Sequence, residues 1–431
     1  MTGFKEHPLR ETLAREMHAR PFGVVDAPAK ISYLAVVNGE ISDDAERQHL
    51  SNLCSVFKVP PPPGDATHFA ENMGRFRLKW ERHTEFATYT FICEEPFEQP
   101  FKEPVIDLIP EDWLSAIPGE VLVASHIAIE GRDMPERAVP ELVGLFDNNT
   151  VMGGHAGGGR ALVWTDFKIH EDRFRRILVR DIGMNHRAMA RLVQRVVEIE
   201  TYRSLAMLAL PLARDARFRV SGFETEVSNI ITSLAGIDGV DDERKLLARL
   251  SILAAEAEQT SVETSYRFSA ARAYYNLVKR RLEDIREDKI VGLQSIGEFI
   301  DKRLGPAMET VENAASRQEV LSRRIARASD LLRTRVDVAL EEQNRDLLRS
   351  MDRRARLQLR LQATVEGLSV VAISYYLLSL ISYLAKGARG FGVVVDPFVV
   401  VTIAFPFVAF GVWAGVRRVR RSVTARKEEE D

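Results

Sequence analysis

The sequence of 431 residues has only two cysteines, Cys54 and Cys93, and neither stands at the short cysteine or histidine spacing of a zinc site. A disulfide framework and a structural metal site are therefore not expected. Residues 1–10 also lack an apolar run that could form the core of a signal peptide. We therefore expect the N-terminal region to stay in the reducing cytoplasm where it is made.

Charge of one sign is not in excess, and the common catalytic motifs are missing. The net charge is -3 with 28% charged residues, which gives no basic field that would indicate nucleic acid binding. There is no nucleophile elbow, HExxH zinc motif, EF-hand loop or dinucleotide fingerprint. Histidines are scattered singly, at His126, His155, His170 and His186. No catalytic residue, metal ligand or cofactor is predicted, and an enzyme is not the favoured class.

Two long uncharged stretches lie near the C-terminus, at residues 367–385 (GLSVVAISYYLLSLISYLA) and 398–416 (FVVVTIAFPFVAFGVWAGV). Each is close to the ~20 apolar residues that a helix needs to cross a bilayer. Pro406 is compatible with a membrane helix. The stretches predict a transmembrane helical hairpin over residues 366–416, with the lipid bilayer as partner. A buried helical hairpin of a soluble protein is the alternative.

Basic residues are denser on the flanks of this hairpin than in its turn, which holds Lys386 and Arg389. The flanking arginines are Arg353, Arg354, Arg356 and Arg360 before the first stretch and Arg417, Arg418, Arg420 and Arg421 after the second. The positive-inside rule predicts that both termini are cytoplasmic and that residues 417–431 form a charged cytoplasmic tail.

Residues 183–365 are dominated by helix formers and predict a long-helix domain. An apolar stripe at spacings of three and four runs through Leu321, Ile325, Ala328, Leu332 and Val336, and continues at Leu347, Met351 and Ala355. We expect a coiled-coil-like last helix that continues without a break into the first apolar stretch. It should pack on the preceding helices, on copies of itself, or on both, so a homo-oligomer is the expected state.

Residues 1–182 predict an α+β domain. Strand-like runs lie at residues 31–37, 75–79, 86–92, 120–129, 161–165 and 176–180, and helical pieces lie at 9–18 and 45–57. Because several runs alternate apolar and polar residues, a mixed or antiparallel sheet is expected rather than a doubly wound parallel one. The predicted fold class is an α+β cytoplasmic N-terminal domain, a mainly helical, coiled-coil-like region and a C-terminal two-helix transmembrane hairpin.

Two segments are candidates for binding an anion or another ligand. The first is GGHAGGGR, residues 153–160, which contains His155 and Arg160. It does not fit a P-loop, because Arg160 leads into the strand-like ALVWT and not into a helix. A plain turn between strands and anion binding by backbone amides and Arg160 both stay open. The second is the polar segment around His18 and Arg20, for which an ordinary helical ion pair between Glu16 and Arg20 is the alternative.

Four segments carry a resemblance to a known family: HPLRETLAREMHARPF, MGGHAGGGRALVWTDFKIHEDRF, VEIETYRSLAMLALPLAR and VEGLSVVAISYYLLSLISYLAKG. Together they resemble a bacterial family of uncharacterised membrane-anchored proteins, domain of unknown function 3422. The resemblance covers nearly the whole chain. It implies a protein of the bacterial inner membrane with two spans, and it implies no reaction and no site residues.

The layout alone is also similar to that of CorA-type divalent-cation channels, which have a cytoplasmic α+β domain, a long helix and two C-terminal spans. Those channels carry Gly-Met-Asn in the turn after the first span. Here that turn is KGARGFG, and Gly183-Met184-Asn185 lies far upstream. A basic turn would also repel divalent cations.

The leading hypothesis is therefore a non-enzymatic, membrane-anchored protein that self-associates through its long helices and binds a ligand or partner with its cytoplasmic head. The alternative is a CorA-like ion channel or transporter that lacks the usual turn motif. The sequence does not identify the small-molecule ligand or the number of subunits.

Overall fold

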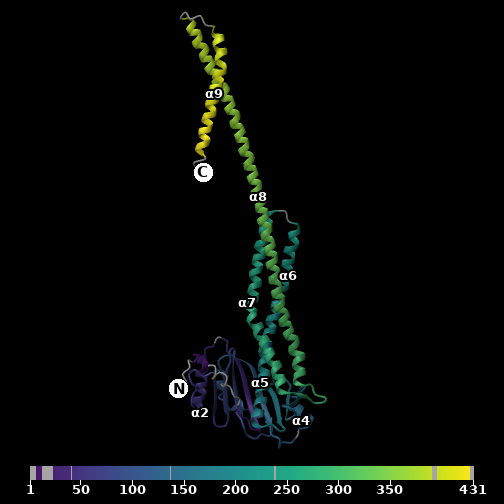
Figure 1. Cartoon of the computed structure of the whole chain (residues 1–431). Helices are drawn as coiled ribbons and strands as arrows, with labels where there is room; N and C mark the ends of the chain where they lie inside the picture. The colour runs from purple at the N-terminus through teal and green to yellow at the C-terminus, as the bar shows by residue number, and fades with distance from the viewer. Residues whose placement is uncertain are drawn as a thin grey trace. The chain divides into compact units, whose positions relative to one another are not determined.

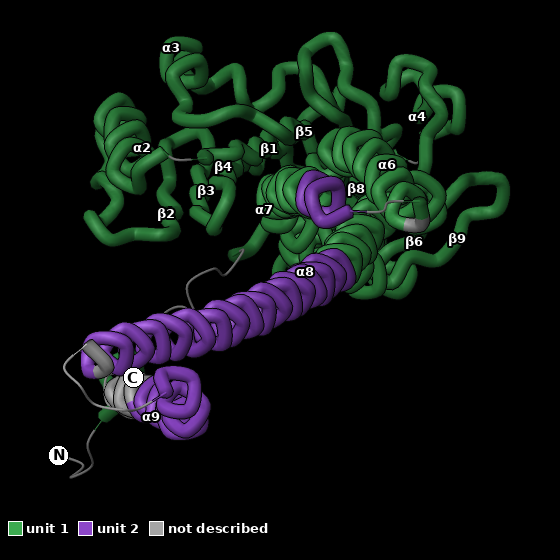
Figure 2. The backbone as a smooth tube through the Cα atoms, turned by 90° about the horizontal axis from the view of Figure 1, so that it is seen from above, with its two compact units in different colours: residues 1–236, 246–329 green, residues 237–245, 330–431 purple. Residues whose placement is uncertain are grey.

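The fold was analysed in a computed structural model that describes residues 6–11, 23–39, 41–135, 137–236, 239–390 and 396–427. The chain divides into two compact units (Figure 2). Unit 1 comprises residues 1–236 and 246–329, and unit 2 comprises residues 237–245 and 330–431. The domain boundaries predicted near residues 182, 365 and 416 stay a prediction.

The described strands of unit 1 form one nine-stranded sheet in the order β2-β3-β4-β1-β5-β8-β7-β6-β9. Their bounds are β1 Ala29–Val37, β2 His68–Asn72, β3 Arg77–Arg82, β4 Phe86–Cys93, β5 Glu120–Glu130, β6 Met152–Ala156, β7 Ala161–Thr165, β8 Arg175–Asp181 and β9 Asp288–Lys289. The pair β5–β8 is parallel and the other pairs are antiparallel. The expected mixed sheet is thus confirmed.

Strand β1 lies in the middle of the sheet and is buried on both faces. Its odd-numbered residues, such as Ile31 and Tyr33, belong to the core beneath the long helices. The alternate residues Leu34 and Val36 belong to a second core on the opposite face. Successive side chains of a strand point to opposite faces, so a strand covered on both sides is apolar almost throughout.

Helix α5 lies along one face of the sheet, and the long helices of unit 1 share one hydrophobic core with that face (Figure 1). These are α5 His186–Met207, α6 Ala209–Ser233, the part of α7 Val240–Ile285 from Leu246 onwards, and α8 Ile296–Gly390 as far as Ser329. Asn185 caps α5 by accepting the N–H of Ala188, and the Glu287 carboxylate accepts the N–H groups of Ile296 and Gly297 at the start of α8. Both helices therefore begin at side chains that satisfy their first free amides.

Short elements cover the other face. They are α2 Asp43–Phe57, the 3-10 helix η1 Val105–Leu108, α3 Glu111–Ser115 and α4 Val139–Gly144. Trp113 of α3 stacks on His49 of α2 and donates its indole N–H to the His49 carbonyl, which ties the two helices together. Cys54 and Cys93 are free thiols in this core, and burial raises the pKa of Cys54 to about 11. A thiol that stays protonated is a packing residue and not a nucleophile.

All six predicted strands are present in the structure, as β1, β3, β4, β5, β7 and β8, and β7 has the predicted bounds. The predicted helix at residues 45–57 is α2, whereas the predicted helix at 9–18 lies largely outside the described residues. Strands β2, β6 and β9 were missed. β6 is glycine-rich and β9 has only two residues, so neither carries a strand pattern that sequence alone would reveal.

Unit 2 contains the end of α8 and α9 Pro397–Lys427, and both helices are long and apolar enough to cross a membrane. The predicted continuation of the last long helix into the first apolar stretch is confirmed, because α8 is unbroken from Ile296 to Gly390. The prediction that residues 386–392 form the turn is wrong in part. The backbone of residues 386–390 is still helical, since no proline stands there to remove a helical N–H.

Candidate functional site

The glycine-rich segment forms the hairpin of β6 and β7, which confirms a turn between strands. Gly157, Gly158 and Gly159 all have positive φ angles, of 62°, 69° and 79°, a region that side chains with a Cβ atom rarely enter. Gly157 donates its N–H to Ile285 O, and Arg160 donates its N–H to Ala156 O. These two amides are bonded within the fold and are not available to a bound anion.

Arg160 lines a cleft of about 290 Å³ between this hairpin, α5 and the end of α7. The lining residues are Gly157, Arg160, Met184, Ala188, Arg191, Leu192, Arg195, Glu283, Asp284, Ile285 and Arg286. Four arginines thus face two carboxylates. We call this cavity the arginine cleft.

The positive charge of the arginine cleft is only partly neutralised. Arg195 pairs with Asp284, whose carboxylate also accepts a hydrogen bond from Arg281 at 3.1 Å. Among the described residues, Arg160, Arg191 and Arg286 have no carboxylate partner. Arg160 donates one guanidinium hydrogen bond to Gly157 O at 3.1 Å. Guanidinium groups bind carboxylates and phosphates through two parallel hydrogen bonds, so three guanidinium groups without a carboxylate partner around one cavity favour an anion there.

The other predicted ligand residues do not join this cleft. His155 is followed by Ala156, which faces the helices, so the histidine points to the opposite side of the sheet. His18 and Arg20 lie outside the described residues. The basic residues that flank the apolar stretches lie on α8 and α9. The described side chains among them are exposed: Arg353, Arg354, Arg356, Arg360, Arg417 and Arg418. Arg420 and Arg421 lie within α9.

The family of the chain follows from its sequence over almost its full length. A family profile described as "Protein of unknown function (DUF3422)" matches residues 5–423. The chain belongs to this family. Neither a curated protein nor a solved structure matches this DUF3422 chain. The predicted family is confirmed, whereas the similarity in layout to CorA-type channels stays a prediction.

The Gly-Met-Asn triplet of this DUF3422 protein has a structural explanation at its own position. Asn185 is the N-cap of α5, and its side chain accepts the N–H of Ala188 at 2.8 Å. Met184 lies against Gly157, so close that a Cβ atom on Gly157 would stand 2.0 Å from the Met184 methyl group. The triplet therefore joins the glycine turn to α5, next to the arginine cleft.

A serine, a histidine and an aspartate lie in a row in the DUF3422 sheet domain. The Ser32 hydroxyl shares a hydrogen bond of 3.0 Å with His126 Nδ1, accepts the N–H of Ile106, and is fully buried. His126 Nε2 lies 4.0 Å from Asp172 Oδ2, and the ring stacks on Phe174. Burial lowers the pKa of His126 to about 4, so the ring is neutral at pH 7. Because no substrate reaches Ser32, we interpret the row as a buried structural link and not as a catalytic triad.

A second polar cavity of the DUF3422 domain, of about 230 Å³, lies between the sheet and α5. Its charged groups and the Tyr33 hydroxyl have partners: Glu198 pairs with Arg281, Glu81 with Lys79, and Tyr33 with Thr201. Because these groups already have partners, a bound ion would gain few new interactions in this cavity. The arginine cleft differs because, among the described residues, three of its four arginines have no carboxylate partner.

Sequence reasoning identified Arg160 but missed Arg191, Arg195 and Arg286. The spacing of Arg191 and Arg195 places them on one face of α5, which is a visible signal, but one shared with many solvated helices. Arg286 follows the end of α7 and has a positive φ of 48°. Only the folded chain brings it to the hairpin.

Proposed function

We propose that this protein is a membrane-anchored, self-associating protein whose N-terminal sheet domain binds a small anion in the arginine cleft. The observation that carries the proposal is the set of three guanidinium groups without carboxylate partners around one cavity. A phosphate or a phosphate monoester fits this chemistry, because its oxygens accept paired hydrogen bonds from several arginines.

Phosphate binding tests the arginine cleft directly. Replacing Arg191 and Arg286 together by glutamine is expected to weaken the binding of inorganic phosphate at least tenfold, because a hydrogen bond to a charged group contributes about 1.5–3 kcal/mol. The affinity would be measured by titration calorimetry on the full chain in mild detergent at fixed low salt. Arg214→Gln on the exposed side of α6 is the matched control. Equal phosphate affinities of the wild type and the double variant would reject the proposed site.

Membrane anchoring is supported by the apolar surfaces of α8 and α9. In the most apolar 18-residue segment of each helix, only 6% of α8 and 0% of α9 is buried within the chain. Apolar side chains of this extent need lipid or a protein partner to cover them. The arginine-rich flanks support a topology in which both ends of the hairpin lie on the cytoplasmic side of the bacterial inner membrane.

Self-association is supported by the part of α8 that precedes its apolar stretch. Leu347 and Met351 belong to the predicted stripe and are exposed in the single chain. A helix with an uncovered apolar stripe gains stability when a second helix packs against it.

One preparation tests both parts of this proposal. We expect the chain to stay in the membrane pellet after an alkaline carbonate wash, and to have a mass above that of a monomer by light scattering in mild detergent. Replacing Leu347 and Met351 by glutamate should reduce the mass without releasing the chain from the membrane. Recovery of the wild type in the soluble fraction, or as a strict monomer in detergent, would contradict the corresponding part.

A further inference from the structure

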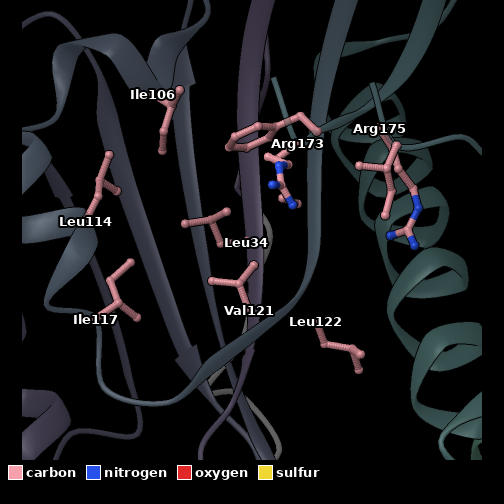
Figure 3. A pocket seen from close by; sticks show the side chains of 11 residues that line it. Leu34, Ile106, Leu114, Ile117, Val121, Leu122, Arg173 and Arg175 are labelled. Atoms are coloured by element: carbon pink, nitrogen blue, oxygen red, sulfur yellow. The ribbon is translucent and has the colours of Figure 1, made fainter. Parts of the chain in front are cut away.

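A groove with apolar walls opens beside strand β5 in unit 1 (Figure 3). Its volume is about 480 Å³, within the ~300–1,000 Å³ that is usual for small-molecule sites. Nine of its eleven lining side chains are apolar, the other two are Arg173 and Arg175, and none is acidic. Leu114 and Ile117 lie on one side of the groove, and the two arginines lie towards the other.

The groove exists because β5 is longer than its neighbour β8. Pairing between the two strands begins at Ser125 and Arg175, although β5 begins at Glu120. Residues 120, 121, 123 and 124 therefore pair with β1 on one side and, within the described chain, with no strand on the other. Arg173 has a positive φ of 69° just before β8 begins, where the chain departs from the line of the strand. The sheet is left open at this point.

The rim of the groove exposes apolar side chains to solvent. Val121 is 50% exposed and Ile169 is 62% exposed, while Leu34 on the floor is buried. A concave apolar surface with a partly exposed rim gains free energy when an apolar ligand covers it, at about 25 cal/mol for each Å².

The charge at the groove is positive and localised. Arg175 pairs with the buried Glu200 at 3.5 Å, so its charge is used inside the fold. Arg173 has no carboxylate partner among the described residues. The neighbouring Asp172 accepts the N–H of Phe174 and faces His126, so it is held away from the Arg173 side chain. One free guanidinium group thus stands beside an apolar cavity.

We infer that this groove binds one amphipathic carboxylate, with its acyl chain along Leu34, Ala124 and Val121 and its carboxylate paired with Arg173. The apolar walls exclude a small hydrophilic anion, because such an ion would lose its hydration without gaining polar partners. The positive charge of Arg173 disfavours a cationic amphiphile such as an alkylammonium ion, because like charges repel each other. The site shares no lining residue with the arginine cleft, so an experiment can reject one of the two proposed sites without rejecting the other.

Equilibrium binding of radiolabelled decanoate to the full chain in lipid nanodiscs tests this inference, with empty nanodiscs as the blank. We expect saturable binding of one decanoate per chain, at least tenfold weaker binding of decanol, and no saturable binding of decyltrimethylammonium. Arg173→Gln should weaken decanoate binding about tenfold, since it removes one charge-assisted hydrogen bond. Arg173 is exposed, so this variant should fold. Arg214→Gln, on α6, should bind like the wild type.

A second variant probes the apolar side of the site. Ala124→Leu narrows the groove and should weaken decanoate and decanol alike. The inference is overturned if decanoate binding does not exceed that of empty nanodiscs, if Arg173→Gln binds it as tightly as the wild type, or if the cationic amphiphile binds equally well. Saturable binding of an uncharged pentapeptide of alternating valine and threonine, in place of decanoate, would also overturn it. That result would assign the open edge of β5 to a peptide strand.

Discussion

Replacing Gly153 by alanine is expected to lower the free energy of unfolding by about 3 kcal/mol or more. A Cβ atom at this position would stand 2.2 Å from the carbonyl oxygen of Val163 and 3.1 Å from the Cα atom of Trp164, on the neighbouring strand β7. Both atoms belong to the backbone, so the clash cannot be relieved by turning a side chain. The two strands would have to separate at the point where Gly153 pairs with Trp164.

Gly158→Ala is the matched control for this prediction. Gly158 lies in the same hairpin, and a Cβ atom there would meet nothing within 4 Å. Its φ of 69° still disfavours alanine, at a cost of about 1 kcal/mol. Denaturant unfolding of the full chain, followed by tryptophan fluorescence, would measure both variants. Equal losses of stability would show that the close approach of β6 and β7 at Gly153 costs no more than the unfavourable backbone conformation at Gly158, and would contradict the prediction.

Replacing Glu200 by glutamine is expected to cost about 3 kcal/mol, the second large effect. Glu200 lies on α5, is 2% exposed, and contacts Arg203 at 2.7 Å and Arg175 at 3.5 Å. Arg203 also stacks over Phe167 at 5.0 Å. Loss of the carboxylate would leave two largely buried guanidinium groups without a counter-charge, and a buried charge without a partner is costly.

An exposed ion pair in the same unit provides the control. Glu226 and Arg249 lie 2.8 Å apart on the surface of α6 and α7. Glu226→Gln should change the free energy of unfolding by less than about 1 kcal/mol, since water screens such pairs. The comparison would be made by denaturant unfolding at the same pH and salt. A loss for Glu200→Gln no larger than that for Glu226→Gln would mean that the Glu200 cluster is more hydrated than its burial indicates.

The arginine cleft and the groove beside β5 differ in the kind of ligand that they favour. The arginine cleft is lined by four arginines and is suited to a compact, multiply charged anion. The groove beside β5 is lined by apolar side chains with one free arginine and is suited to an amphiphile. Measuring phosphate and decanoate binding on the same set of variants would separate the two sites, because no lining residue is shared.

Patterns repeated along the chain determined much of the architecture. The two uncharged stretches predicted the apolar ends of α8 and α9, and spacing at threes and fours predicted the long helices. The apolar run of β1 and the five residues of β7 were sufficient to predict strands. The glycines after Ala156 predicted a turn. In each case the signal is local, because periodicity, length and turn chemistry act between residues close in sequence.

Only the tertiary structure decided where binding chemistry is concentrated. Arg160, Arg191 and Arg286 come from a hairpin, a helix and a helix end, and no spacing in the sequence relates them. The groove depends on the register between β5 and β8, which leaves residues 120–124 without a paired strand on one side among the described residues. Gly153 looked like part of the turn, but its role is the close approach of two strands. These features arise from contacts between distant segments, so a single sequence carries no local pattern for them, and the fold alone brings them together.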